Sequence, residues 1–131
     1  MGTRQQGIYV ITGIMASGKS TVAQLLAERL DESVHLRGDV FRKMIVNGRK
    51  EVTQNARQAE LEQLSLRYRL TAQAAETYFQ AGFNVVVQDV ILGTMLVDFV
   101  AAIQSRPLYV VVLCPSASVV ARREAERSKK G

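Results

Sequence analysis

Cysteine, tryptophan and proline are scarce in this sequence, which has one, none and two of them in 131 residues. The single Cys114 cannot form a disulfide within the chain, and this favours a reducing, cytoplasmic location. No apolar run approaches the ~20 residues that a membrane-spanning helix needs, and residues 1–7 lack the apolar core of a signal peptide. We therefore expect a cytoplasmic protein without a membrane partner.

Residues that bind zinc are equally scarce. His35 is the only histidine, so no cluster of cysteine and histidine has the spacing of a zinc site. Its place in an expected strand favours a packed or edge residue over a catalyst. The net charge of +5 is spread along the chain apart from a basic cluster in residues 122–130. Anionic small substrates explain this charge as well as nucleic acid does, and we expect no nucleic-acid partner.

What the sequence does contain is the composition of one globular domain, with 47% hydrophobic and 22% charged residues. Apolar runs alternate with helical stretches, a pattern typical of an α/β protein with a parallel sheet flanked by helices. We expect strands at 8–12, 33–36, 84–90 and 108–113, and helices at 19–30, 40–46, 53–81, 94–103 and 117–130. The last two strands are apolar on both faces, which predicts central positions. Four apolar residues share one face of the first helix: Val22, Leu25, Leu26 and Leu30.

The most informative motif lies between the first expected strand and the first expected helix. It has the form glycine, four residues, glycine, lysine and serine. Its residues are Gly13, Ile14, Met15, Ala16, Ser17, Gly18, Lys19 and Ser20, with Thr21 next. Glycines let the backbone approach a phosphate closely, and successive N–H groups form an anion nest at the helix N-terminus. An ordinary glycine turn is the alternative, and the flanking strand and helix favour the phosphate-binding loop (P-loop).

The same motif predicts roles for three side chains. Lys19 is expected to reach the β- and γ-phosphates of a nucleoside triphosphate, and Ser20 to ligate magnesium. Thr21 is expected to help hold the α-phosphate. We therefore predict ATP and Mg²⁺ as the cofactors.

Two carboxylates follow expected strands at the edge where open parallel sheets bind ligands. Asp39 follows the second strand and is the candidate base that takes a proton from an attacking hydroxyl. Asp89 closes the third strand and is the candidate for binding the acceptor or, on the magnesium side, the metal. The alternatives are an N-cap role for Asp39 and a strand-end turn role for Asp89.

Three arginines are further candidates. Arg42 lies three residues beyond Asp39 and either binds the acceptor or is a solvated helix residue. Arg123 and Arg127 are four residues apart and share a helix face. From there they either fold over the phosphates as a lid that neutralises transition-state charge, or belong to a solvated basic helix.

In these segments, Gly13 to Thr21, Asp39 to Arg42, the strand ending at Asp89, and Arg123 to Arg127, the chain resembles small P-loop kinases. That group contains gluconate, shikimate and adenylylsulfate kinases, and the greatest likeness is to proteins similar to chloramphenicol phosphotransferase and the zeta toxins. The resemblance spans nearly all of residues 1–131. It implies a three-layer P-loop NTPase fold with sheet order 2-3-1-4 and a fifth strand to follow.

The resemblance also implies transfer of phosphate from ATP to a small-molecule hydroxyl, with Asp39 as the base and Arg123 and Arg127 in the lid. Gln88 stands where such kinases often carry a second acidic residue, so the magnesium role expected for Asp89 is an indirect one. Because the sequence supplies no fifth strand, we expect one kinase-like domain, truncated at its C-terminus.

The sequence thus predicts an ATP-dependent kinase with a small-molecule hydroxyl as its acceptor. One alternative is a nucleotide kinase, in which residues 53–82 supply the base-binding segment. Another is an NTP-binding switch without transferase activity, in which Gln88 positions water. The long helix around residues 61–79 is also a candidate surface for a homodimer.

Overall fold

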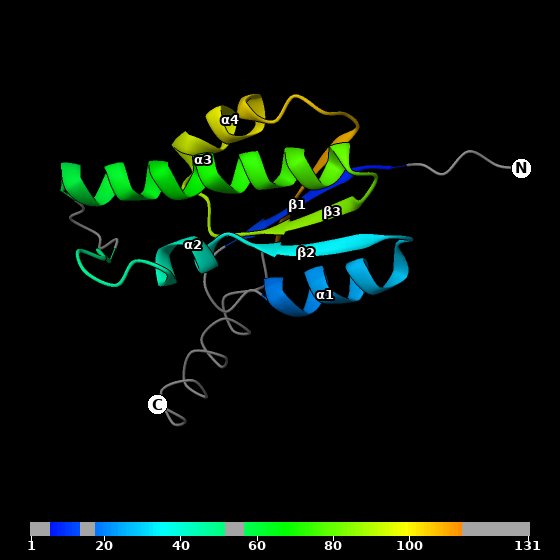
Figure 1. The fold of residues 1–131 in the computed structure, drawn as a ribbon, viewed down its shortest axis with the longest axis horizontal. Helices are drawn as coiled ribbons and strands as arrows, with labels where there is room; N and C mark the ends of the chain where they lie inside the picture. The colour runs from blue at the N-terminus through cyan, green and yellow to red at the C-terminus, as the bar shows by residue number, and fades with distance from the viewer. Residues whose placement is uncertain (1–5, 14–17, 52–56, 114–131) are drawn as a thin grey trace, which may run out of the picture.

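Four parallel strands form the centre of the molecule (Figure 1). The computed structural model describes residues 6–13, 18–51 and 57–113. Its strands are β1 (Ile8–Gly13), β2 (Ser33–Arg37), β3 (Asn84–Gln88) and β4 (Leu108–Leu113). They are arranged in the order β2-β3-β1-β4, which confirms the 2-3-1-4 sheet of a P-loop NTPase.

Helices cover both faces of the sheet, so the fold has three layers. The helix α1 (Lys19–Arg29) lies on one face, and α3 (Gln58–Gln80) and α4 (Gly93–Ala102) lie on the other (Figure 1). A short helix, α2 (Asp39–Lys43), follows β2 and contacts α3. Among the helices in these described ranges, none combines the length and apolar character that crossing a membrane requires.

The core has two parts because the central strands bury both of their faces. Toward α3 and α4, Val85 and Val87 of β3 pack with side chains that include Tyr68 and Phe99. Toward α1, Val86 packs with Ile11, Ala23 and Ala27. All three β3 valines are fully buried, which confirms the central position expected for this strand.

The face that α1 turns to the sheet differs from the one expected. Ala23 and Ala27, four residues apart, are its buried apolar residues, whereas Val22 and Leu25 are 38% and 50% exposed. Alanine leaves room for the helix backbone to lie close to the sheet, so the small residues face inward. Leu26 and Leu30 are partly buried and pack against this core. The expected inner face was therefore wrong for Val22 and Leu25 and right for Leu26 and Leu30.

The position expected for β4 was also wrong within the described residues. It pairs with β1 alone and stands at one end of the described sheet. Tyr109 and Val112 are 47% and 54% exposed there. An apolar sequence predicts that a strand has covered faces, but it does not specify a second neighbour, and no described strand pairs with the outer edge of β4.

Candidate phosphoryl-transfer site

The two glycines that frame the P-loop motif have backbone conformations suited to glycine. Gly13 ends β1 with a φ of 153° and Gly18 precedes α1 with a φ of 86°. Both angles lie in the region that residues with a Cβ rarely adopt. The strand β1 and the helix α1 thus lie before and after the loop of the motif, as the motif requires. Residues Ile14, Met15, Ala16 and Ser17 lie outside the described residues.

The start of α1 presents its first turn at the carboxyl end of β1. Gly18 occupies the N-cap position and makes no side-chain capping hydrogen bond, and the N–H groups of a first helical turn are suited to binding an anion. Lys19 is buried, whereas Ser20 and Thr21 are exposed. A cation and two hydroxyls therefore stand at the N-terminus of one helix, where its dipole favours negative charge.

Asp39 is the first residue of α2, and the N-cap is Gly38. No side-chain capping hydrogen bond is made there, so the alternative role of Asp39 as an N-cap is wrong. Its carboxylate instead accepts a hydrogen bond from Arg42 Nε at 2.9 Å and another from Arg67 Nη1 at 3.4 Å. Lys43 Nζ lies 3.4 Å from its second oxygen. The hydrogen bond from Arg42, above all, holds the pKa of Asp39 below its ordinary value.

Asp89 lies one residue beyond β3 and is 4% exposed. The Arg67 guanidinium donates hydrogen bonds to both Asp89 oxygens, one from Nε to Oδ2 at 3.1 Å and one from Nη2 to Oδ1. The Val90 N–H also donates to Oδ1, at 2.8 Å, as a strand-end turn residue would allow. Burial raises the pKa of Asp89, and Arg67 opposes that rise.

Arg67 was missed by the sequence analysis, although it joins the two carboxylates. It lies on α3 with a side chain that is 12% exposed. A signal was present, because Arg67 stands next to Tyr68 and between Leu64 and Thr71, at the spacing of the helix face that is buried. An arginine on a buried face needs an acidic partner, and that partner was already a candidate residue.

Arg42 is shared between two acidic residues. Besides Asp39, its guanidinium donates to Glu51 at 2.6 Å, and its side chain is 22% exposed. Arg42 is therefore bonded to two carboxylates and is not simply a solvated helix residue. Within the described ranges, the structure has no group of three or more histidine, cysteine or acidic side chains that could hold a metal ion.

The end of β2 approaches Asp89 so closely that only glycine fits at position 38. A Cβ on Gly38 would lie 2.1 Å from Asp89 Oδ2 and 2.7 Å from its Cγ. The Gly38 N–H also donates to the Gln88 carbonyl at 3.0 Å. Because Gly38 immediately precedes Asp39, this close contact fixes the place from which the candidate base projects.

This contact gives a first prediction. Gly38→Ala is expected to lower the Tm by roughly 5 °C or more, because the added methyl must push the buried Asp89 carboxylate away from Arg67. Thermal unfolding followed by circular dichroism measures the shift. Gly93→Ala is the matched control, because a Cβ there meets nothing within 4 Å. Equal Tm values for the two variants would contradict this reading of the contact.

His35 lies on β2, at the opposite end of the described sheet from β4. Its Nδ1 is 2.8 Å from Gln24 Oε1 and its Nε2 is 2.6 Å from Gln88 Oε1. Burial lowers its pKa. The expectation of a packed or edge histidine is confirmed, and Gln88 is thereby engaged with a neighbouring strand.

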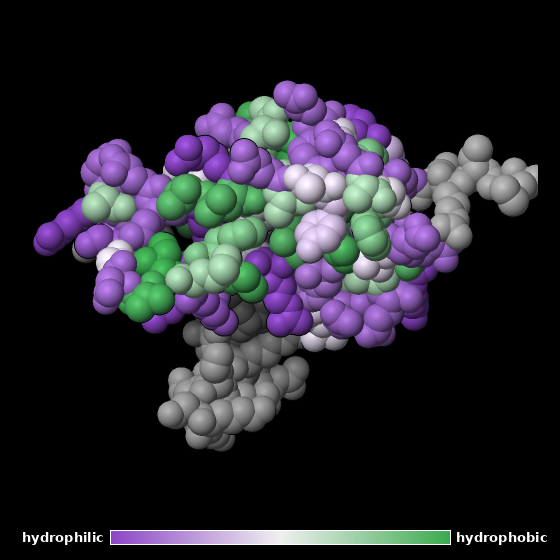
Figure 2. All heavy atoms as spheres, viewed as in Figure 1, coloured by the Kyte–Doolittle hydropathy of each residue, from purple (hydrophilic) through white to green (hydrophobic). Residues whose placement is uncertain are grey.

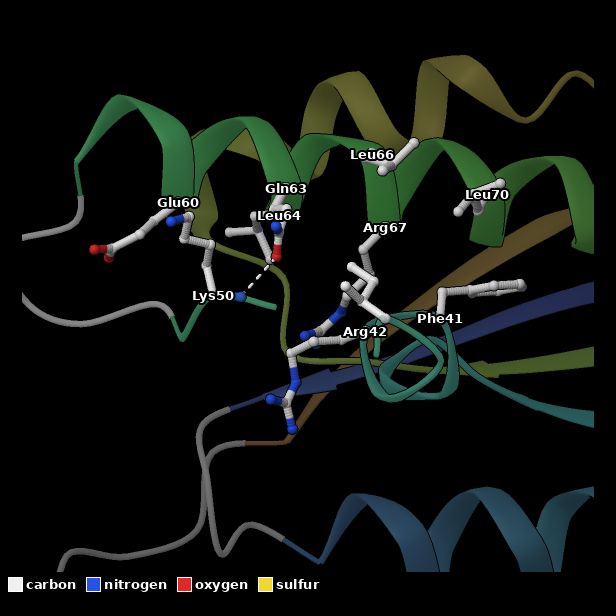
Figure 3. Close-up of a pocket in the computed structure, with 10 residues that line it drawn as sticks. Phe41, Arg42, Lys50, Glu60, Gln63, Leu64, Leu66, Arg67 and Leu70 are labelled. Carbon is white, nitrogen blue, oxygen red and sulfur yellow. Dashed lines mark hydrogen bonds between the residues drawn. The ribbon is translucent and has the colours of Figure 1, made fainter. Parts of the chain in front are cut away.

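A pocket of about 70 Å³ lies between α2 and α3 (Figure 3). Its wall is mainly apolar and includes Phe41, Ile45, Leu64, Leu66 and Leu70. Arg42 and Arg67, which both bind Asp39, also line it. In Figure 3 both arginine side chains extend away from α3. The pocket is therefore adjacent to the carboxylate pair.

Apolar side chains also gather on the surface beside this pocket. Figure 2 shows them over α2, the turn after it and the neighbouring part of α3. Among them, Met44 and Val46 are 60% and 89% exposed, and Leu66 is 39% exposed. Leu66 belongs both to this surface and to the pocket wall.

The remaining predicted site residues, Arg123 and Arg127, lie outside the described residues, as does the helix expected at 117–130. The structure places together Asp39, Arg42 and Asp89, with Arg67 as their link. Lys19, Ser20 and Thr21 stand at the start of α1, which follows β1. The strand β1 pairs with β3, the strand that precedes Asp89.

The family model described as an AAA domain matches residues 8–131, and the chain belongs to that family. Among curated proteins, no sequence matches it. A chain of the Pnkp1/Rnl/Hen1 RNA repair complex is 17% identical with a TM-score of 0.72, covering 99% of this chain. This chain spans only 40% of that one.

Two further solved structures share the fold. A kinase candidate from Chloroflexus aurantiacus is 18% identical with a TM-score of 0.68, covering 99% of this chain and 71% of its own. A sugar kinase from Janibacter sp. HTCC2649 is 20% identical with a TM-score of 0.65, covering 94% of this chain and 68% of its own. At such identities the likeness shows the fold, and it confirms the P-loop architecture expected from the motif.

Proposed function

We propose that this protein is an ATP-dependent phosphotransferase that moves the γ-phosphate to a hydroxyl of a small molecule. The observation that carries the proposal is the placement of Asp39. It follows β2 at the carboxyl edge of a parallel sheet in which β1, the strand beyond β3, leads into the P-loop motif. Ligands of open parallel sheets bind at this edge, which supports a shared site for the candidate base and the nucleotide.

ATP would be held by the residues from Gly13 to Thr21, with Lys19 at the β- and γ-phosphates. Ser20 would ligate Mg²⁺, with Asp89 contributing indirectly, and the ion would neutralise charge on the phosphates. Arg123 and Arg127 would close over the phosphates as a lid. The buried position of Lys19 in the first turn of α1 supports this arrangement.

In the proposed reaction, the acceptor hydroxyl oxygen attacks the γ-phosphorus while Asp39 takes the hydroxyl proton. The bond from the γ-phosphorus to the bridging oxygen breaks, and ADP leaves with that electron pair. The Asp39 carboxylate is ionised at neutral pH, as a proton acceptor must be, and its lowered pKa makes it a weaker base than an ordinary aspartate. Arg42 would orient this carboxylate and meet the acceptor.

The switch alternative is less well supported. It needs a side chain that positions water, and Gln88 was the candidate. In the structure the Gln88 side chain is 2.6 Å from His35 Nε2, and its backbone carbonyl accepts the Gly38 N–H. The side chain and the backbone of Gln88 thus both hold β2 against β3, which favours a structural role.

The test of this proposal is ADP release by the protein with ATP and Mg²⁺ against a panel of hydroxyl compounds. The panel contains sugars, sugar acids, nucleosides, nucleotides and aminoglycoside- or chloramphenicol-like compounds. It also contains a 5′-hydroxyl oligonucleotide, because one protein that shares the fold belongs to an RNA repair complex. Stimulation by a small molecule is expected. Stimulation by the nucleotides or the oligonucleotide alone would replace the small-molecule assignment.

We also propose that the pocket between α2 and α3 receives a non-reacting, apolar part of the acceptor. Leu66→Trp is expected to raise KM for the acceptor roughly tenfold and to leave KM for ATP unchanged, because the indole fills the pocket. Steady-state kinetics with each substrate varied in turn measures both constants. Val97→Trp, on the exposed face of α4, is the matched control. An unchanged acceptor KM in the Leu66 variant would place the acceptor elsewhere.

A further inference from the structure

Arg67 is the point at which three separate elements meet. It comes from α3, and its guanidinium contacts Asp39 at the start of α2 and Asp89 just beyond β3. Two of its nitrogens bind the Asp89 carboxylate and the third lies 3.4 Å from Asp39 Oδ1. One planar side chain thereby connects two carboxylates that the sequence analysis treated as independent.

The two carboxylates have different surroundings. The Asp89 side chain is 1% exposed, whereas the Asp39 side chain is 40% exposed. Because a buried carboxylate with hydrogen bonds to both oxygens has little freedom, Asp89 is the fixed end of this cluster. Asp39 is the outer end, where a proton can be exchanged with a bound molecule.

The fixed end is itself anchored by hydrogen bonds between α3 and the segment that follows β3. The Tyr68 hydroxyl donates to the Val90 carbonyl at 2.7 Å and accepts from the Leu92 N–H at 3.2 Å. Tyr68 follows Arg67 directly on α3. On the other side, Gly38 packs against Asp89 without space for a Cβ. The turn after β3 is therefore held by α3 and by the end of β2 at once.

We propose that Arg67 is a positioning residue that anchors Asp39 to the buried Asp89 and so holds the candidate base in its reactive place. This inference rests on the proposed function of Asp39. An arginine suits the task because its rigid fork binds one carboxylate with two nitrogens and has a third nitrogen left for the other. A lysine keeps the charge but cannot span both carboxylates in this geometry.

The first experiment is a double-mutant cycle in the full chain, with single-turnover transfer rates for wild type, Arg67→Gln, Asp39→Asn and the double variant. Arg67→Gln is expected to slow transfer roughly a hundredfold, as misplacement of a catalytic group does, with ATP affinity unchanged. In the Asp39→Asn background the same change is expected to cost nothing further. Equal losses in both backgrounds would overturn the proposal, because a purely structural arginine acts whether or not Asp39 is present.

Two other variants control for charge and folding. Arg69→Gln removes an exposed arginine from the same helix and is expected to leave the rate unchanged. Arg67→Lys keeps a cation beside the buried Asp89, so it serves as a folded comparison if Arg67→Gln does not fold. Its rate is expected to stay well below that of wild type, with circular dichroism unchanged. Full activity in Arg67→Lys would show that charge alone is needed and would overturn the anchoring role.

A second readout does not depend on activity. The side-chain carboxyl carbon of Asp39, assigned by comparison with Asp39→Asn, is followed by NMR as the pH is lowered. The charged groups around Asp39 are Arg42, Lys43, Arg67 and Asp89, and the cationic ones favour its ionised form. Arg67→Gln is expected to raise the titration midpoint of Asp39, and Arg69→Gln to leave it unchanged. An unchanged titration midpoint of Asp39 in Arg67→Gln would overturn the coupling between Arg67 and Asp39, and this result does not require a known acceptor. A wild-type protein that transfers phosphate to no acceptor would overturn only the proposed function.

Discussion

Replacing Lys19 by alanine is expected to slow phosphoryl transfer by about two to three orders of magnitude. Lys19 is the first residue of α1, it is buried, and it follows Gly18, the second glycine of the P-loop motif, whose φ is positive. Its ammonium group would stabilise the charge that shifts onto the β–γ bridging oxygen and the γ-phosphate oxygens as the bond breaks. No other described cation shares the first turn of α1.

The measurement is kcat for ADP release with saturating ATP, Mg²⁺ and the best acceptor of the panel. Arg29→Ala serves as the matched control, because it removes a cation from the last turn of the same helix. It is expected to retain wild-type turnover. If Lys19→Ala also turned over normally, the P-loop assignment on which the whole account depends would be lost.

Asp39→Asn is expected to lower kcat by about two to four orders of magnitude while the affinity for ATP stays the same. Asparagine has nearly the same shape and its oxygen still accepts hydrogen bonds from Arg42 and Arg67, but it cannot take a proton. The hydrogen bonds from the two arginines are therefore kept, whereas the ion pair with Lys43 and the proposed proton acceptor are removed. Isothermal titration with ATP and Mg²⁺ gives the affinity, and the coupled assay gives kcat.

Asp98→Asn on α4 is the matched control, because Asp98 is exposed and belongs to a helix away from the carboxylate pair. It is expected to behave as wild type in both measurements. A loss of ATP affinity in Asp39→Asn would show that Asp39 serves the structure of the site instead of accepting a proton.

The pH dependence of the wild type follows from the same carboxylate. The pKa of Asp39 is held below its ordinary value, chiefly by the hydrogen bond from Arg42, so the base is fully ionised at neutral pH. The ionised form is lost only as the pH falls through this depressed value. On the acid side, base-limited activity is therefore expected to persist to a lower pH than an unperturbed aspartate would allow.

Much of the architecture followed from local patterns in the sequence. The all-valine centre of β3 predicted a strand buried on both faces, and the glycines at positions 13 and 18 predicted where β1 ends and α1 begins. These features depend on residues close together in the chain, so periodicity and backbone preference are sufficient to find them. The sheet order came from the resemblance to P-loop kinases.

The misjudged features depend on contacts between distant segments. Ala23 and Ala27 face the sheet because close packing favours small residues, although Leu25 is more hydrophobic than either. Arg67 and Asp89 are 22 positions apart and pair only because the fold lays α3 across the end of β3. A pattern in one segment cannot report its partner in another, so the link between the carboxylates was absent from the sequence argument.

The central claim, that Asp39 and the P-loop cooperate in phosphoryl transfer, is tested most directly with ATP radiolabelled at the γ-phosphate. Wild type and Asp39→Asn are incubated with the acceptor that stimulates ADP release most, and the label recovered in the acceptor is measured. The account predicts labelled acceptor from wild type, formed in step with ADP, and almost none from Asp39→Asn at equal ATP occupancy. Label that appears only as inorganic phosphate, at the same rate in both proteins, would contradict it.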